Sequence, residues 1–174
     1  TNYVSNTAPT NQKFTYLSTN NAAAFIEMTG DGVMRLSRAG SGTVYVVRNV
    51  NFDGPPAALK VSFDFNAETT GGTSNSAIEV MVGQSFPNSN SAPSSGNKFS
   101  SFYIQLKSPT GTPGNWTVGA TSSASPSSYN TVQKVTWVMN KSGVEKVYTA
   151  PNGSTDTVGN NQYDLWVGNN REVN

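Results

Sequence analysis

The sequence predicts an all-β protein: a two-sheet antiparallel β-sandwich of the jelly-roll, concanavalin-like kind. Short apolar runs recur between turn signals along the 174 residues, and none keeps the 3.6-residue period of an amphipathic helix. The 16 Gly, the 9 Pro and abundant Ser, Thr and Asn favour turns and strands over helices. Many short strands without helices are typical of a sandwich or barrel. We expect a single domain over residues 1–174.

Eleven runs have the alternation and the β-branched or aromatic content of strands. In chain order they cover residues 14–17, 24–28, 33–38, 43–49, 59–65, 77–82, 99–107, 116–121, 132–140, 146–150 and 163–167. Asn152 and Gly153 both tolerate positive φ, so they predict a tight hairpin turn between run 146–150 and a further strand at 155–158. Within run 59–65 the odd-numbered residues are all apolar, and we expect them to fill the sandwich interior.

Charge and composition narrow the possible partners. Only 12% of residues are charged and the net charge is +1, which does not suit nucleic acid, because binding there depends on clustered Lys and Arg. No apolar run approaches the roughly 20 residues of a membrane span. The chain lacks Cys and His, which excludes disulfides, thiol chemistry, serine triads and histidine metal sites. We expect no nucleic acid, no membrane insertion, and an extracellular or cell-surface location.

Residues 102–107 carry the clearest binding signal. The even-numbered positions from 102 to 106 are apolar and form a core face, while Tyr103, Gln105 and Lys107 lie on the other face about 7 Å apart. A ring, an amide and an ammonium group in a row suit a sugar, whose C–H face stacks on rings and whose hydroxyls need polar partners. Trp166, which shares a strand face with Asp164, offers a second outward ring. The predicted ligand-binding residues are Tyr103, Gln105, Lys107, Trp166, Arg35 and Asp64.

Two other tryptophans are expected in the core. Trp137 has Val135 and Met139 two residues away on either side, and Trp116 shares its face with Val118. A large ring on an apolar strand face is more often packed in the interior than exposed to a ligand.

The sequence supports a catalytic function less well than a binding function. Glycoside hydrolysis usually needs two carboxylates that face each other across a cleft. The best candidate pair in this sequence is Asp64 and Glu79, on different strands. The simpler explanation is that both are solvated acids on the protein surface. A polysaccharide lyase remains an alternative, with Tyr103 and Lys107 acting beside Arg35 or Arg38.

No cofactor is expected. Glu27, Asp31 and Asp53, together with backbone carbonyls in Gly-rich turns, offer only oxygen ligands for a structural calcium ion. The spacing does not match an EF-hand loop, and solvated turns are the default interpretation.

The last third of the chain resembles a known family. Residues 135–143 read VTWVMNKSG, residues 148–154 read YTAPNGS and residues 164–168 read DLWVG, while residues 61–65 read VSFDF. This series is similar to β-jelly-roll modules appended to secreted bacterial pectate lyases and related polysaccharide-degrading enzymes. The likeness runs from about residue 14. It implies a non-catalytic, carbohydrate-directed accessory module within a larger multidomain protein, with a plant or algal cell-wall polysaccharide as ligand.

One departure from that pattern raises another alternative. Modules of this type continue past the WVG segment into one more strand, whereas here the chain is expected to stop without it. The favoured explanation is that the sequence is trimmed at this boundary. The alternative is an open sheet edge that is completed by a strand from another chain. On this interpretation the protein is a structural or adhesive surface domain.

Overall fold

A computed structural model describes residues 14, 16–20, 22–40, 42–48, 56–68, 76–87, 89, 91–106, 114–121 and 127–174. These residues form thirteen β-strands and one short 3-10 turn, and they contain no α-helix. All of the strand pairs whose register is defined are antiparallel. The all-β antiparallel sandwich predicted from the sequence is confirmed, whereas the jelly-roll connectivity remains a prediction.

The chain divides into two compact units, and the expectation of a single domain remains a prediction. The first unit comprises residues 1–55 and 83–99. In it β1 (Tyr16–Thr19) pairs with β4 (Val44–Val47), and β2 (Ala24–Met28) pairs with β3 (Met34–Arg38). The 3-10 turn η1 (Ser95–Asn97) also belongs to it. Each strand overlaps an apolar run predicted from the sequence, although β1 begins two residues later than the predicted run 14–17.

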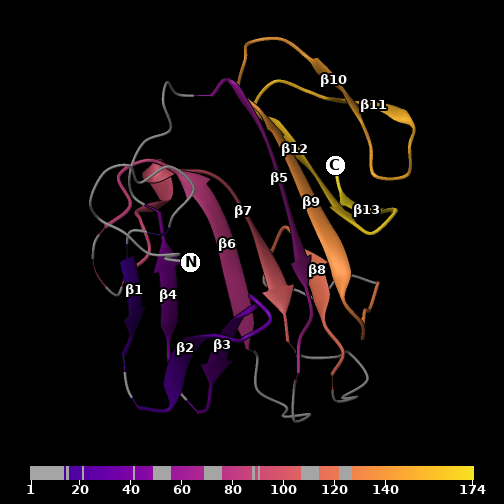
Figure 1. Cartoon of the computed structure of the whole chain (residues 1–174). Helices are drawn as coiled ribbons and strands as arrows, with labels where there is room; N and C mark the ends of the chain where they lie inside the picture. Colours follow the sequence, from indigo (N-terminus) through magenta and orange to yellow (C-terminus); the bar gives the residue numbers. More distant parts are fainter. Residues whose placement is uncertain are drawn as a thin grey trace. The chain divides into compact units, whose positions relative to one another are not determined.

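The second unit comprises residues 56–82 and 100–174 and holds two sheets and a hairpin (Figure 1). The four-stranded sheet has the order β13 (Asn170–Val173), β12 (Gln162–Val167), β9 (Gln133–Asn140), β5 (Ala58–Phe65). The three-stranded sheet has the order β6 (Ala77–Gly83), β7 (Lys98–Gln105), β8 (Thr117–Gly119). The hairpin consists of β10 (Lys146–Thr149) and β11 (Thr155–Val158).

The register of the four-stranded sheet separates a core face from an outer face. Val61 of β5 lies opposite Trp137 of β9, which lies opposite Leu165 of β12, and all three side chains point to the core face. Across the core, the Trp137 ring meets Phe102 of β7 edge to face, with 5.0 Å between ring centroids. Both rings are fully buried, so this contact joins the two sheets into a sandwich.

Trp116 forms a second aromatic centre in the same core. Its ring lies 4.9 Å from Phe65 and 5.0 Å from Tyr129, measured between centroids, and its side chain is fully buried. The core positions predicted for Trp116 and Trp137 are therefore confirmed.

The residues after the WVG segment do form a strand. β13 pairs with β12 through Val167–Asn170 and Trp166–Arg171, with a register shift between Leu165 and Trp166. The expectation that this strand is missing is therefore wrong. The strand has only four residues, and the first three, Asn170, Arg171 and Glu172, are polar, so it gives no strand signal in the sequence.

Candidate functional site

The face of β7 that was predicted to bind ligand is largely covered. Gln105 is only 4% exposed, and its sheet partner Thr117 is fully buried, so the expected open position of Gln105 is wrong. Alternation placed Gln105 opposite the core face, but this end of the β7–β8 pair is covered on both faces. Tyr103 is half-buried and lies opposite Gly119. Lys107 falls outside the described residues.

Trp166 lies on the outer face of the four-stranded sheet, as alternation predicts, yet it is not open to solvent. Its side chain is 4% exposed, and Asp164 on the same face is 1% exposed. The predicted role of Trp166 as an exposed stacking ring is therefore wrong. The β10–β11 hairpin supplies the reason, because Tyr148 of β10 contacts both side chains.

We call Tyr148, Asp156, Asp164, Trp166 and Arg171 the polar network. The Tyr148 hydroxyl donates to Asp164 Oδ2 at 2.7 Å and accepts from Trp166 Nε1 at 2.9 Å. Arg171 donates to Asp164 Oδ1 at 2.6 Å and to Asp156 Oδ2 at 3.1 Å. The Arg171 guanidinium also lies 5.8 Å from the Trp166 ring centroid. These bonds join the hairpin to β12 and β13.

The network fixes the protonation states of its members. Burial, followed by the hydrogen bond to Asp164, raises the pKa of Tyr148 well above its usual value, because both disfavour the phenolate. Burial alone would lower the pKa of Arg171, but the hydrogen bond and the charge of Asp164, together with the charge of Asp156, raise it. Tyr148 thus remains a neutral donor and Arg171 a cation at physiological pH.

Asn140 fastens the base of the same hairpin. Its fully buried amide nitrogen donates to the carbonyls of Val144, at 2.7 Å, and Val158, at 3.0 Å. Its Oδ1 accepts from the Ser142 backbone N–H at 3.0 Å. The far end closes with the predicted turn, in which Gly153 has a φ of 85°. The hairpin predicted from Asn152 and Gly153 is confirmed, and it is held at its base and on its inner face.

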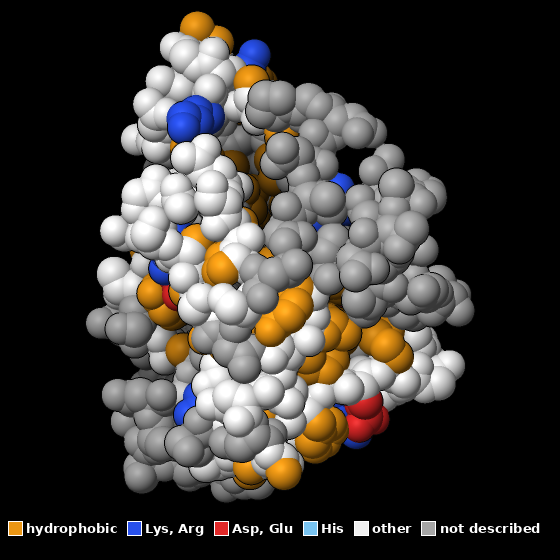
Figure 2. Space-filling view, turned by 90° about the vertical axis from the view of Figure 1, so that its left-hand side faces the viewer, with side chains coloured by type: hydrophobic (Ala, Val, Ile, Leu, Met, Phe, Trp, Pro, Cys, Tyr) orange, Lys and Arg blue, Asp and Glu red, His pale blue; other side chains and the backbone are white. Residues whose placement is uncertain are grey.

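The other two predicted site residues are exposed and paired. Asp64, on the outer face of β5, forms an ion pair with Lys134, with 2.9 Å between Oδ1 and Nζ. Arg35 lies in the first unit, on β3, and its Nη1 lies 3.5 Å from Glu27 Oε1. On the face shown in Figure 2, charged side chains are few and scattered among apolar and uncharged polar ones.

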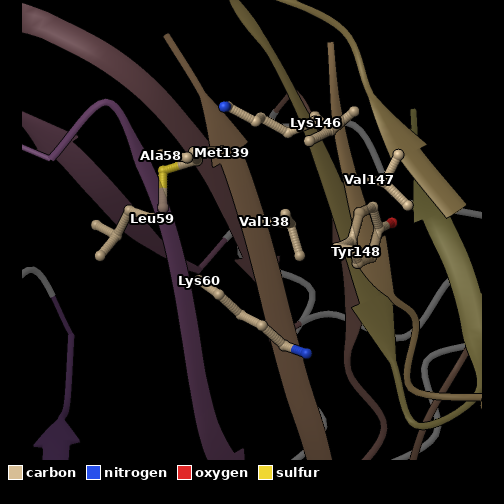
Figure 3. Close-up of a pocket in the computed structure, with 9 residues that line it drawn as sticks. Ala58, Leu59, Lys60, Val138, Met139, Lys146, Val147 and Tyr148 are labelled. Atoms are coloured by element: carbon tan, nitrogen blue, oxygen red, sulfur yellow. The ribbon is translucent and has the colours of Figure 1, made fainter. Parts of the chain in front are cut away.

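A pocket of about 270 Å³ lies between the outer face of β5 and β9 and the hairpin (Figure 3). Its size is close to the roughly 300–1,000 Å³ of small-molecule sites. Figure 3 shows the Tyr148 ring on the hairpin side, across from Val138 of β9. The lining residues are Ala58, Leu59, Lys60, Val138, Met139, Lys146, Val147, Tyr148 and Val158.

The lysines of the pocket come from opposite sides of it. Lys60 extends from β5 across β9, and its Nζ donates to the Thr149 carbonyl at 3.2 Å. Lys146 extends from β10 in the opposite direction, back over β9 (Figure 3). The opening is therefore bounded by two ammonium groups above an apolar floor.

The expectation that the odd-numbered residues of run 59–65 fill the interior implies that Lys60 points outward, but Lys146 and Tyr148 were not recognised as its partners. The spacing of Lys146 and Tyr148, two apart on a strand, places them on one hairpin face. That spacing was the available signal. It does not reveal that this face packs onto the outer side of β9.

The hydroxyl of Tyr148, the tyrosine that lines the pocket, is engaged in hydrogen bonds. A lyase needs a tyrosine hydroxyl that is free to exchange a proton with substrate at a suitable pKa. The Tyr148 hydroxyl is instead held by Asp164 and Trp166, and its pKa is raised. Only the ring of Tyr148 is left to meet a ligand.

The described residues contain no group of three or more acidic side chains arranged to hold a metal ion. Of the three residues considered for calcium, Asp53 falls outside the described residues. Asp31 accepts a hydrogen bond from the Thr29 hydroxyl, which is the main reason that its pKa is lowered. Within the same described ranges, no helix is long and apolar enough to cross a membrane.

In comparisons with known proteins, no family model, no curated protein and no solved structure matches this chain.

Proposed function

We propose that the chain is a non-catalytic carbohydrate-binding module of jelly-roll type. In this proposal it belongs to a larger secreted or cell-surface protein and binds a plant or algal cell-wall polysaccharide. Its binding site is the pocket between β5, β9 and the hairpin. The sequence likeness to modules of polysaccharide-degrading enzymes supports the same class of function.

The observation that carries the proposal is the chemistry of the pocket lining. Tyr148 supplies a ring, and Ala58 and Val138 supply an apolar floor for the C–H face of a sugar. Lys60 and Lys146 supply donors for its oxygens. The Tyr148 ring is oriented before any ligand arrives, because the polar network holds its hydroxyl, and such preorganisation lowers the entropy lost on binding.

The expected affinity is modest. A single ring stack contributes on the order of 1 kcal/mol, and a pocket of this size holds few contacts. The dissociation constant is therefore expected in roughly the micromolar to millimolar range.

Affinity electrophoresis on a panel of soluble cell-wall polysaccharides tests the proposal. The wild type should be retarded by at least one polysaccharide without releasing reducing ends. Ala58→Trp places a large ring in the pocket mouth and should abolish retardation. Ser62→Trp, on the same strand face outside the pocket, is the matched control and should retain it.

Two outcomes would replace the proposal. Release of unsaturated chain ends would establish a polysaccharide lyase. Absence of both retardation and release across the panel would favour the structural or adhesive domain. A parallel gel with chelator shows whether retardation depends on calcium.

A further inference from the structure

We infer that the pocket selects glycans whose sugars carry an anionic substituent, a carboxylate or a sulfate, held by Lys60 or by Lys146. This inference rests on the proposed function and narrows it to a class of ligand. Its first support is that the lining contains two lysines and no acidic side chain.

The two ammonium groups retain donors for a ligand. Lys60 Nζ gives one hydrogen bond, to the Thr149 carbonyl, and an ammonium group has three donors. That bond also positions the Lys60 charge at the hairpin side of the pocket. Lys146 reaches the opposite side of the opening (Figure 3). A substituent beside either ammonium group would accept charge-assisted bonds from it.

Both charged residues of the pocket lining are positive. Asp164 lies directly opposite Val138 of the pocket floor in the sheet register, but its carboxylate is paired with Arg171. The polar network holds two carboxylates, Asp156 and Asp164, against the single guanidinium of Arg171, which leaves one negative charge. Lys60 and Lys146 bring two positive charges to the lining itself, and Glu145, which precedes Lys146 in the chain, is not a lining residue.

The surroundings favour a sugar over other anions. Nucleic acid needs a wider basic surface than two lysines, because many phosphates are neutralised together. The apolar floor and the Tyr148 ring match the C–H face of a pyranose ring, which bare phosphate lacks. An anionic sugar would contact both the apolar part of the lining and the lysines.

The test compares ligands that differ only in charge. Retardation would be measured with a polyuronate and its methyl ester, and with a sulfated galactan and its desulfated form. We expect the charged member of at least one pair to bind at least about tenfold more tightly than its neutral form, the order expected for charge-assisted bonds. This preference should weaken as salt is raised from low to physiological ionic strength. The pair that shows the difference identifies the substituent as carboxylate or sulfate.

Lysine variants locate the effect. Lys60→Met and Lys146→Met should each weaken binding of the charged glycan several-fold, and the double variant at least about tenfold. Lys134→Met is the matched control, because Lys134 lies on the same outer face but pairs with Asp64 outside the pocket. It should leave affinity within about twofold. Thermal midpoints of all variants should remain within a few degrees of wild type, which separates a binding role from a structural one.

Equal binding of charged and neutral forms, unchanged by the lysine variants but lost in Ala58→Trp, would overturn this inference and leave the proposed function standing. No binding to any glycan would overturn both. Charge-dependent binding that is lost in Lys134→Met and retained in the pocket variants would place the anion site elsewhere and overturn the inference.

Discussion

The two halves of the outer sheet face share the same alternation of core and outward residues but have opposite environments. On β12, Asp164 and Trp166 alternate with core residues and are buried under the hairpin. On β5, Ser62 and Asp64 alternate with core residues in the same way and are exposed. The difference arises because the hairpin after β9 lies over one half only. Alternation therefore tells which face a residue is on, whereas exposure depends on what packs against that face.

The pocket lies at the border between these halves. Its floor is formed by Ala58 and Lys60 of β5 and by the buried Val138 of β9, and its wall is formed by β10. The pocket therefore exists only while the β10–β11 hairpin is held in place over the covered half of the sheet. The following predictions test that difference, from the largest expected effect to the smallest.

Trp166→Ala should be the most damaging single change. It removes a buried ring from the covered half and leaves a cavity, which should lower the free energy of unfolding by about 4 kcal/mol. Chemical denaturation monitored by far-UV circular dichroism measures the change. Asp64→Ala is the control from the open half. A loss as small as that of Asp64→Ala would show that the covered half contributes little to stability.

Asp164→Ala should cost about 3 kcal/mol, because it leaves the Arg171 guanidinium without its closest carboxylate in a partly buried site. The double variant Asp164→Ala/Arg171→Met should cost less than the sum of the two single changes. Additive losses in this double-mutant cycle would show that the 2.6 Å ion pair is not coupled in solution.

Tyr148→Phe keeps the ring in the pocket and removes the hydroxyl that joins Asp164 to Trp166. We expect a loss of about 2 kcal/mol in unfolding free energy, because two buried polar atoms lose a partner. Glycan affinity should fall modestly, since the ring is present but less firmly held. Affinity that drops as far as in Ala58→Trp would mean that the hydroxyl itself contacts the ligand.

Alkaline pH should weaken the fold. Burial and then the hydrogen bond to Glu172 raise the pKa of Tyr129 to about 12 from its usual value of about 10. Between these values the unfolded chain loses a proton that the folded chain keeps, so stability is complete below pH 10 and declines as the pH rises towards 12. Thermal midpoints measured from pH 8 to pH 12 should show this decline. Tyr129→Phe should decline less steeply, and an identical slope would exclude Tyr129 as a source.

The smallest effect belongs to the open half. Asp64→Ala breaks an exposed ion pair with Lys134, so its cost should be below about 1 kcal/mol and should shrink further at high salt. A cost comparable to that of Asp164→Ala would erase the difference between the two halves.

The fold was largely predictable from the sequence. Alternation and turn residues located the strands, the Asn152–Gly153 hairpin and the core positions of Trp116 and Trp137, because each depends on neighbours within a few residues. The strand β13 was missed, since four residues of which three are charged or polar give little signal.

The candidate site was much less predictable. Lys60, Val138 and Tyr148 are far apart in the chain, and they meet only because β5 pairs with β9 and the hairpin folds back over that pair. Gln105 and Trp166 were misjudged for the same reason, because their covering comes from segments that alternation on one strand does not reveal. Sheet order and the path of the hairpin are the missing information.

The most direct test of the account is to map the ligand on the protein by nuclear magnetic resonance. A short oligosaccharide of whichever polysaccharide retards the protein would be titrated into labelled protein while amide chemical shifts are followed. The account predicts that the largest changes cluster at Ala58, Val138 and Val147, with little change at Tyr103. Changes centred on Tyr103, with the pocket residues unmoved, would contradict it and return the binding site to β7.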